Sequence, residues 1–204
     1  MNYEKIIKAF ELKKKNQPSS LLKSAVLVPI ISVKDELHVL FEVRSHQLKS
    51  QPGEICFPGG KVENNETLQE SALRETVEEL NISINNIQVV GKLDPVITLF
   101  DMIIYPYCGI IHDINLEDIS YNTKEVASIF TVPLKELLQQ KPLVHKVKMN
   151  TSPDENFPFH LVQQGTKYHW RVSDYYVYFY QYQHYVIWGI TAKILYHFLE
   201  IIRA

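Results

Sequence analysis

The sequence contains few cysteines and no clustered histidines, and this scarcity excludes two common kinds of site. Its 204 residues include only two cysteines, Cys56 and Cys108, which lie far apart in the chain. A disulfide framework is therefore not expected, and the composition fits a reducing compartment such as the cytoplasm. The eight histidines show neither an H-x-x-x-H spacing nor a spacing that pairs them with cysteine, so we expect no zinc site.

Long apolar runs and a large net charge are also missing. No apolar run approaches membrane-spanning length, and residues 1–15 are charged throughout, without the apolar core of a secretion signal. The formal net charge is −2, with no basic stripe that would favour nucleic acid as a partner. We therefore expect a cytoplasmic protein that binds neither a membrane nor nucleic acid.

The remaining composition is typical of a globular protein. Of the residues, 46% are apolar and 22% are charged, and a chain of 204 residues can bury a sizeable core. We expect a single domain over residues 1–204, because no repeat, low-complexity tract or linker interrupts the chain. Within this domain, residues 1–22 are expected to form an N-terminal helical extension and residues 187–203 a C-terminal helix.

Apolar runs between polar turns predict the strands and a further short helix. Pro29, within the first of these strands, indicates an edge or a bulge. Residues 141–165 contain three prolines and are expected to form an irregular surface connection. The expected strands lie at 25–31, 37–44, 87–93, 103–111 and from 125 onward, and the short helix lies at 133–140.

Residues 169–185 are unusually rich in tyrosine and allow two interpretations. The rings could offer a stacking surface for adenine, or they could belong to the core and interface of a sheet. We favour the second interpretation, because apolar packing is the commoner use of such a run. It leaves open whether this strand also forms the interface of a homodimer.

The stretch from Phe57 to Ile82 predicts a glycine turn, a short acidic loop and one helix. Thr67 and Glu70 have the T-x-x-E spacing of a capping box, so the helix is expected to begin there. Asn81 follows the last turn and tolerates the left-handed conformation that ends many helices. The apolar face of this helix is expected to pack onto a sheet and consists of Leu73, Val77 and Leu80.

Three carboxylates lie on the opposite face of the same helix. Glu75, Glu78 and Glu79 stand at i, i+3 and i+4, and like charges at this spacing repel by roughly 0.2–0.5 kcal/mol per pair on an exposed helix. A hard divalent cation such as Mg²⁺ or Mn²⁺, which prefers oxygen ligands and is often shared with substrate phosphates, would remove that repulsion. Taken alone, the helix is better explained as a solvated acidic face, so its surroundings decide the interpretation.

Those surroundings resemble the Nudix box, G-x5-E-x7-R-E-U-x-E-E-x-G-U, in which U is a bulky aliphatic residue. Thr76 and Asn81 stand where an aliphatic residue and glycine are usual, but neither departure removes a carboxylate. At roughly 6% usage of each residue type, six fixed positions match by chance in on the order of one such chain in a hundred thousand. The matching residues are Gly60, Glu66, Arg74, Glu75, Glu78, Glu79 and Ile82.

The resemblance implies an α/β Nudix fold, with a mixed β-sheet sandwiched between α-helices, and the activity of a metal-dependent pyrophosphohydrolase. Mg²⁺ or Mn²⁺ would be held by Glu78 and Glu79, with Glu75 as a further ligand or as the base that takes a proton from water. The carbonyl group of Gly59 is an additional expected ligand, since glycine lets the backbone approach closely. Three other residues of the box are expected to hold its structure: Gly60, Glu66 and Arg74.

Residues before the box resemble the additional motif of coenzyme A pyrophosphatases, L-L-T-x-R-[SA]-x3-R-x3-G-x3-F-P-G-G. Phe41 and Glu42 stand where Leu and Thr are usual, and Lys49 replaces the second Arg, which keeps the charge but loses bidentate recognition of phosphate. Residues 188–192 match the W-G-x-T-A end of the same family. The matching residues before the box are Leu40, Arg44, Ser45, Gly53 and residues 57–60.

This second resemblance implies that the substrate is coenzyme A or one of its derivatives. The products would be adenosine 3′,5′-bisphosphate and 4′-phosphopantetheine. Arg44, Ser45 and Lys49 are the expected substrate-binding residues, because a cationic pair beside an acidic metal site suits an anionic substrate. The alternative is that these side chains lie on a surface loop and do not bind the substrate.

Glu125 opens the segment EVASIFTVPL, which resembles the region where Nudix enzymes bring a late acidic residue to the metal site. Glu125 would then be a fourth catalytic carboxylate, as ligand or base, and the alternative is an exposed residue at the start of a strand. Two other functions stay open: a Nudix enzyme for ADP-ribose, dinucleotides or nucleoside triphosphates, and an inactive nucleotide-binding module. Because such modules typically lose box carboxylates and this chain keeps them, we favour an enzyme.

Overall fold

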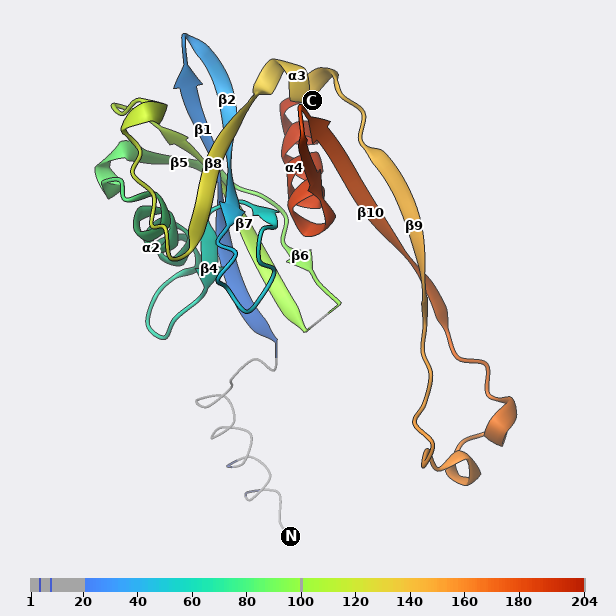
Figure 1. Ribbon diagram of the computed structural model, residues 1–204. Coiled ribbons are helices and arrows are strands. Elements are labelled where there is room, and N and C mark those ends of the chain that lie inside the picture. Colours follow the sequence, from blue (N-terminus) through green and yellow to red (C-terminus); the bar gives the residue numbers. More distant parts are fainter. Residues whose placement is uncertain (1–3, 5–7, 9–20, 100, 204) are drawn as a thin grey trace. The chain divides into compact units, whose positions relative to one another are not determined.

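The computed structural model describes residues 4, 8, 21–99 and 101–203, which divide into two compact units. The first unit, Met1–Leu134, contains a large mixed sheet, and the second, Lys135–Ala204, contains a three-stranded sheet (Figure 1). The mixed α/β class expected from the sequence is therefore confirmed, whereas a single domain stays a prediction. The helical extension expected over residues 1–22 falls almost entirely outside the described residues. No helix among the described residues is long and apolar enough to cross a membrane.

The sheet of the first unit has the strand order β3-β2-β1-β7-β5, and in addition β4 pairs with β1, β6 with β7 and β8 with β2. Only β1 and β7 run parallel in the described part of this sheet, from Leu22 opposite Met102 to Ile31 opposite Ile111. The strands are β1 Leu22–Val33, β2 Glu36–Arg44, β3 Ile55–Cys56, β4 Gly59–Lys61, β5 Ile87–Lys92, β6 Val96–Ile97, β7 Met102–Ile111 and β8 Val126–Pro133. Each strand expected from the apolar runs is present, with ends that differ by a few residues.

Pro29 lies in a central strand, so the expectation of an edge is wrong. On one side β1 pairs with β7 without interruption, and on the other it pairs first with β4 and then with β2. Pro29 falls between the residues paired with β4, which end at Val26, and those paired with β2, which begin at Ile30. Because neither strand is paired with β1 in this interval, the missing N–H of proline removes no hydrogen bond there.

The helix of the expected box is α2, Leu68–Leu80, and both of its ends follow the sequence prediction. The Thr67 hydroxyl accepts from the Glu70 backbone N–H at 3.2 Å, and the Glu70 carboxylate accepts from the Thr67 N–H at 2.7 Å. Asn81 has left-handed backbone angles, φ 51° and ψ 42°, and its side-chain amide donates to the carbonyl group of Ser120. Short-range spacing alone therefore predicts where this helix starts and stops.

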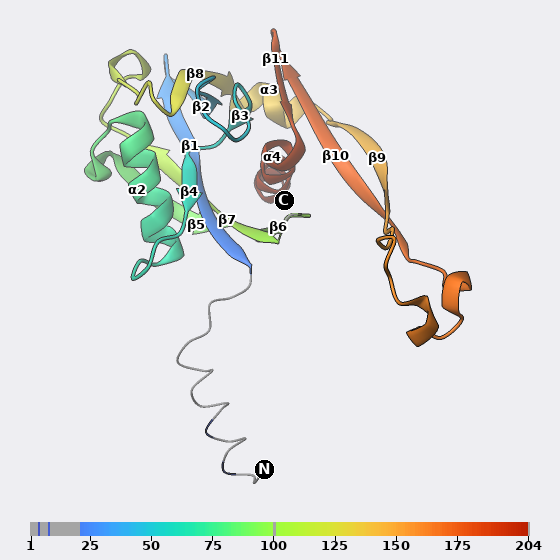
Figure 2. The same cartoon turned by 60° about the horizontal axis from the view of Figure 1, so that its bottom comes forward.

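The buried face of α2 differs from the expected one. Leu73 and Val77 are only partly buried, whereas Ala72 and Thr76 are fully buried together with Leu80. Helix α2 packs against β1 and β4, as Figure 2 shows, and this contact turns the small residues inward. Thr76 is tolerated at an aliphatic position because its hydroxyl donates to the Ala72 carbonyl group at 2.7 Å, which satisfies the buried polar atom.

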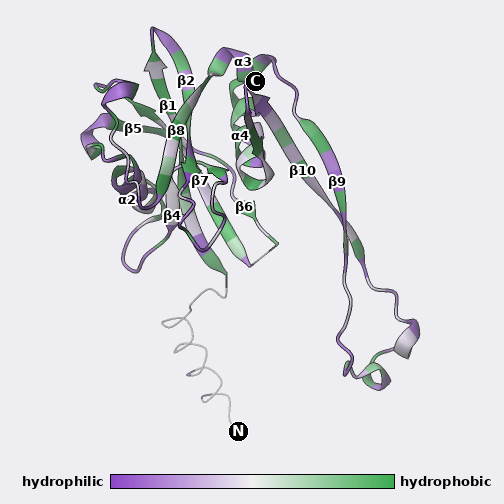
Figure 3. Cartoon of the chain, in the orientation of Figure 1, coloured by the Kyte–Doolittle hydropathy of each residue, from purple (hydrophilic) through white to green (hydrophobic). Residues whose placement is uncertain are grey.

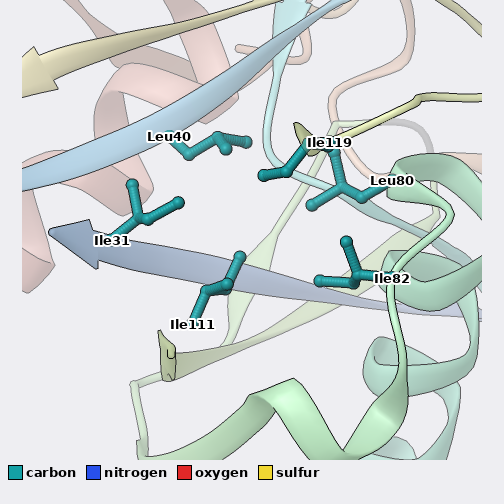
Figure 4. Close-up of a cluster of buried hydrophobic side chains, with 6 residues drawn as sticks. All are labelled: Ile31, Leu40, Leu80, Ile82, Ile111 and Ile119. Atoms are coloured by element: carbon teal, nitrogen blue, oxygen red, sulfur yellow. The ribbon is translucent and has the colours of Figure 1, made fainter. Parts of the chain in front are cut away.

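The core of the first unit joins α2 to the sheet through apolar side chains. Figure 4 shows one cluster, in which side chains from β1, β2, β7 and the end of α2 point toward one another. It consists of Ile31, Leu40, Leu80, Ile82, Ile111 and Ile119. A second cluster consists of Ala25, Leu27, Ala72 and Tyr107. These contacts fix the position of α2, and therefore of its carboxylates, relative to the sheet.

The second unit contains an antiparallel sheet of order β11-β10-β9. The irregular connection expected over residues 141–165 is therefore wrong in part, because its first residues pair with β10 and form a strand. The elements from Leu134 onward are α3 Leu134–Gln139, β9 Leu143–Asn150, β10 Val172–Tyr182, β11 Tyr185–Trp188 and α4 Gly189–Arg203, with short 3-10 helices at Phe159–Leu161 and Gly165–Lys167. The first unit contains two further 3-10 helices, at Ile84–Asn86 and Leu116–Asp118.

Helix α4 begins at Gly189, two residues later than expected, because Ile187 and Trp188 pair with β10. Most of α4 is hydrophobic in Figure 3, whereas α2 is mostly hydrophilic. Tyr180 is 1% exposed, and Tyr178 stacks on Tyr196 of α4 with ring centroids 4.9 Å apart. The interpretation of the tyrosine-rich strand as sheet core therefore holds for these residues. The packing of the C-terminal helix on the larger sheet stays a prediction.

Candidate active site

The glycine turn before α2 holds one carboxylate of the helix by a direct backbone contact. The Gly59 N–H donates to Oε2 of Glu79 at 2.8 Å, while Gly59 itself pairs with Val26 of β1. Its φ of +151° is rarely adopted by other residues, and a Cβ atom there would lie 2.4 Å from the Ala25 carbonyl oxygen. The position therefore requires glycine, and it fixes Glu79 against the sheet.

Glu79 is the buried one of the three glutamates Glu75, Glu78 and Glu79 of α2, with 5% of its surface exposed. Burial raises the pKa of Glu79 to about 8, the Gly59 N–H opposes this rise, and the charges of Glu75 and Glu125 add to it. A buried carboxylate among other carboxylates is unfavourable unless a proton or a cation accompanies it. The position of Glu79 thus favours a site that binds a proton or a cation.

Arg74 connects Glu75 and Glu78 of α2 to Glu66 of the preceding loop. Its guanidinium group lies 3.0 Å from Glu66, 3.0 Å from Glu75 and 3.3 Å from Glu78, and it also donates to the Lys61 carbonyl group at 3.3 Å. The Arg74 side chain, followed by the Glu63 N–H, lowers the pKa of Glu66 to about 2. Arg74 and Glu66 are therefore placed to hold the loop against α2, as the resemblance implies.

Gly60 and Glu75 approach each other at the same turn. A Cβ atom at Gly60 would lie 2.4 Å from the carboxylate carbon of Glu75, so any larger residue would displace that side chain. Burial raises the pKa of Glu75, while the neighbouring Arg74 lowers it. Glu78 is exposed over 53% of its side chain, so the three glutamates of α2 occupy different environments.

Glu125 lies in the turn before β8 and reaches the same group of carboxylates. Its negative charge raises the pKa of both Glu79 and Glu75. The turn is tied to its neighbours, since the Asn122 N–H donates to the Glu79 carbonyl group at 2.8 Å and the Ser45 N–H donates to the Glu125 carbonyl group at 2.7 Å. The residue itself is exposed, so its side chain can reach a substrate or a water molecule.

Of the expected substrate-binding residues, Arg44 is the last residue of β2, and Ser45 and Lys49 lie in the loop that follows. Arg44 is half-buried, and its charge lowers the pKa of Glu79. Ser45 is 4% exposed and its hydroxyl accepts from the Gln47 N–H at 3.4 Å, which shapes the loop. Lys49 is exposed. The structure therefore brings Arg44 to the carboxylates and leaves Lys49 on the loop surface.

Glu42 is a site residue that the sequence interpretation missed. It is 1% exposed on β2, and burial raises its pKa well above the usual range, helped by the charges of Glu79 and Glu125. The signal was present in the alternation of the strand, because Leu40, Glu42 and Arg44 share one face. Cys56 lies opposite Glu42 on β3, and burial raises the pKa of its thiol, which disfavours a nucleophilic thiolate.

The side chains around Glu79 suit a hard divalent cation. Among the described residues, no three His, Cys, Asp or Glu side chains are already placed to hold a metal ion together. The available donors are nevertheless all oxygens, and Mg²⁺ or Mn²⁺ commonly keeps several waters beside one or two carboxylates. The buried carboxylate oxygens of Glu42, which have no hydrogen-bond partner among the described residues, are also suited to binding a cation.

The raised pKa of Glu79 predicts how the stability of the metal-free protein depends on pH. The folded state binds a proton more tightly than the unfolded state, whose carboxyl pKa is 4.5, so the free energy of unfolding falls as pH rises from about 4.5 to about 8. We expect a loss on the order of a few kcal/mol over this range. Urea unfolding in a chelator measures it.

Glu79→Gln is the matched control for this prediction, because it keeps the side-chain volume but cannot titrate. Its unfolding free energy should fall less between pH 5 and pH 8 than that of the wild-type protein. Identical pH profiles for the two proteins would contradict the raised pKa of Glu79.

Comparison with known proteins gives consistent results. The family model described as NUDIX domain matches residues 21–152. The chain is 39% identical over 121 residues to Nudix hydrolase 3 of Caenorhabditis elegans, which covers 58% of this chain and 50% of that protein. It is 36% identical over 142 residues to the mouse peroxisomal coenzyme A diphosphatase NUDT7. This alignment covers 68% of this chain and 57% of that protein.

A bacterial relative matches over a longer range. The chain is 32% identical over 202 residues to the uncharacterized Nudix hydrolase NudL of Klebsiella pneumoniae, which covers 96% of this chain and 92% of that protein. The matched part of the chain thus spans about half the length of the first two relatives and nearly the whole length of the third.

Proposed function

The chain belongs to the NUDIX domain family, whose members are pyrophosphohydrolases, and we propose that it hydrolyses the pyrophosphate bond of coenzyme A or a derivative. The observation that carries the reaction type is the buried carboxylate of Glu79, held on the Gly59 N–H beside Glu75 and Glu125. The products would be adenosine 3′,5′-bisphosphate and 4′-phosphopantetheine. The mouse relative that is named as a coenzyme A diphosphatase supports this choice of substrate.

Nudix hydrolases generally use divalent metals, and we assign Mg²⁺ or Mn²⁺ to this site. Glu78, Glu79 and the carbonyl group of Gly59 would hold the ion, with Glu75 as a further ligand. When bound, the ion would neutralise the pyrophosphate and acidify the attacking water. Because the Gly59 N–H binds Oε2 of Glu79, the ion would be held through Oε1 of that carboxylate.

A carboxylate must take the proton from the attacking water, and two residues are suited to this role. Burial raises the pKa of Glu75, and a carboxylate with a raised pKa is a better proton acceptor. Glu125 is exposed and lies close enough to raise the pKa of Glu75 and Glu79. Because Arg74 already binds Glu75 at 3.0 Å, Glu125 is the freer of the two to move toward the water.

The substrate would lie along the segment between β2 and β3. Arg44 is near enough to Glu79 to lower its pKa, so its guanidinium group can contact a phosphate oxygen at the metal site. Lys49 extends from the exposed part of the same loop and would bind a more distant phosphate as a point charge. Ser45 would act through its backbone and hydroxyl, which fix the loop.

A substrate panel tests this assignment against the other Nudix activities. The ratio kcat/KM should be highest for coenzyme A or an acyl ester, at least tenfold above ADP-ribose, a dinucleotide and a nucleoside triphosphate. Preference for ADP-ribose or a dinucleotide would contradict the proposed substrate but not the proposed hydrolysis of a pyrophosphate bond. Tight nucleotide binding without turnover of any member would instead indicate a binding module.

We also propose a cytoplasmic location and self-association as a homodimer. The support for a dimer is an exposed apolar face of β9 and β10 that includes Val144, Val172 and Tyr176, which are 47%, 56% and 52% exposed. A contiguous patch of exposed apolar side chains commonly marks a protein–protein interface. A molar mass in solution of one chain, rather than two, would contradict the dimer.

A further inference from the structure

We propose that Glu42 is a further ligand of the divalent cation, shared with Glu79. This inference rests on the proposed function, since it requires a metal-dependent site. The Nudix resemblance assigns no role to this position, where coenzyme A pyrophosphatases usually have threonine. A glutamate at this position places a carboxylate in the interior, which is unfavourable unless another group compensates its charge.

The pairing of β2 with two neighbouring strands places Glu42 near the carboxylates of Glu79 and Glu125. Glu42 lies on β2 between two paired strands, opposite Cys56 of β3 and Ile129 of β8. Leu40, on the same face, belongs to the apolar cluster under the end of α2. Within two residues this face of β2 therefore changes from the apolar core at Leu40 to the acidic site at Glu42, which neighbours Glu79.

In the described part of the chain, no N–H or hydroxyl group donates to the carboxylate of Glu42, whose hydrogen-bonding neighbour is the carboxyl group of Glu79. Glu42 itself is 1% exposed. Its acidic neighbours are Glu79 and Glu125. Arg44 is the nearby cation, but its Nε is also buried without a hydrogen-bond partner, so the two side chains do not satisfy each other through that atom.

A buried carboxylate in such surroundings requires either a cation or a proton. A proton shared with Glu79 would make Glu42 a structural residue with no influence on metal binding. A divalent cation between Glu42 and Glu79 satisfies oxygens of both residues and offsets both charges, which a single proton cannot do. These two explanations differ in what happens when the charge of Glu42 is removed.

Titration of the apo protein with Mn²⁺ alone, followed by electron paramagnetic resonance of the free ion, distinguishes them. Glu42→Gln keeps the volume of the side chain, and Glu42→Thr introduces the residue usual in coenzyme A pyrophosphatases. We expect both to weaken Mn²⁺ binding at least tenfold. Glu36→Gln, an exposed glutamate on the same strand, should bind Mn²⁺ as the wild type does.

The Tm of each metal-free variant gives a second readout. Removal of a buried carboxylate without donors should leave the metal-free Tm of both Glu42 variants equal to or above that of the wild type. The rise in Tm on addition of Mn²⁺ should be smaller in both variants than in the wild type. A lower metal-free Tm, or failure to fold, would mean that Glu42 supports the fold without metal and would overturn the proposal.

The remaining outcomes separate this inference from the proposed function. If the wild type binds Mn²⁺, Glu79→Gln weakens it and both Glu42 variants bind as the wild type does, Glu42 is no ligand and the proposed function stands. If the wild type itself binds no Mn²⁺ at millimolar concentration, the metal-dependent function fails and the role of Glu42 fails with it.

Discussion

Replacement of Glu79 by glutamine is expected to lower kcat on the order of a thousandfold while leaving the fold intact. The amide oxygen can still accept the Gly59 N–H, which the carboxylate accepts at 2.8 Å, so the turn should keep its geometry. The negative charge is lost, and an amide is a much weaker ligand for Mg²⁺ or Mn²⁺. Loss of several kcal/mol of electrostatic stabilisation by the metal corresponds to this change in rate.

Glu63→Gln is the matched control for Glu79→Gln. Glu63 lies in the exposed loop before α2, and its side chain is solvated. Its variant should retain the kcat of the wild type, and the circular dichroism spectra of all three proteins should agree. Turnover by Glu79→Gln within tenfold of the wild type would contradict the assignment of Glu79 as a principal ligand.

Replacement of Gly59 by alanine is expected to destabilise the fold by about 3 kcal/mol and to abolish activity. The new Cβ atom would lie 2.4 Å from the Ala25 carbonyl oxygen and 2.6 Å from the Val26 Cα atom, and these are backbone atoms that cannot move aside. The φ of +151° adds strain for any residue with a side chain. Because the same turn fixes Glu79, activity and stability should fall together.

Gly91→Ala is the control for this second substitution. Gly91 is an exposed glycine of β5, and a Cβ atom there would meet nothing within 4 Å. Urea unfolding of the two variants should therefore show a large loss for Gly59→Ala and a change of less than about 1 kcal/mol for Gly91→Ala. Equal stability of the two variants would show that the Gly59 turn is not constrained as described.

The parts of the site that the sequence predicts are those that depend on neighbouring residues. The capping box of Thr67 and Glu70 and the left-handed Asn81 follow from spacing along one loop and one helix, and the Nudix resemblance implies the structural role of Arg74 and Glu66, which form an ion pair. Such contacts form within a few residues, so a local pattern is sufficient to place them.

The parts that the sequence does not predict depend on long-range pairing. Glu75, Glu78 and Glu79 share one side of α2, yet only Glu79 is buried, because the glycine turn covers that edge of the helix. Glu42 reaches the site only because β2 lies between β3 and β8 in the sheet. No local pattern indicates that pairing.

Strand β9 was missed for a related reason. Residues 143–150 carry only a weak alternation of apolar and polar residues, and nearly all of them are exposed. Their strand conformation comes from pairing with β10, from Leu143 opposite Phe179 to Asn150 opposite Val172. The three prolines of residues 141–165 flank or follow this strand, so they do not interrupt it.

The identity of the products formed from coenzyme A tests the central claim most directly. Purified protein is incubated with coenzyme A and Mg²⁺ or Mn²⁺, with a parallel sample in a chelator, and the products are identified by mass. We predict adenosine 3′,5′-bisphosphate and 4′-phosphopantetheine in equal amounts with metal and neither in the chelator. Intact coenzyme A in the presence of metal would contradict the proposed substrate, and cleavage that persists in the chelator would contradict the metal-dependent mechanism.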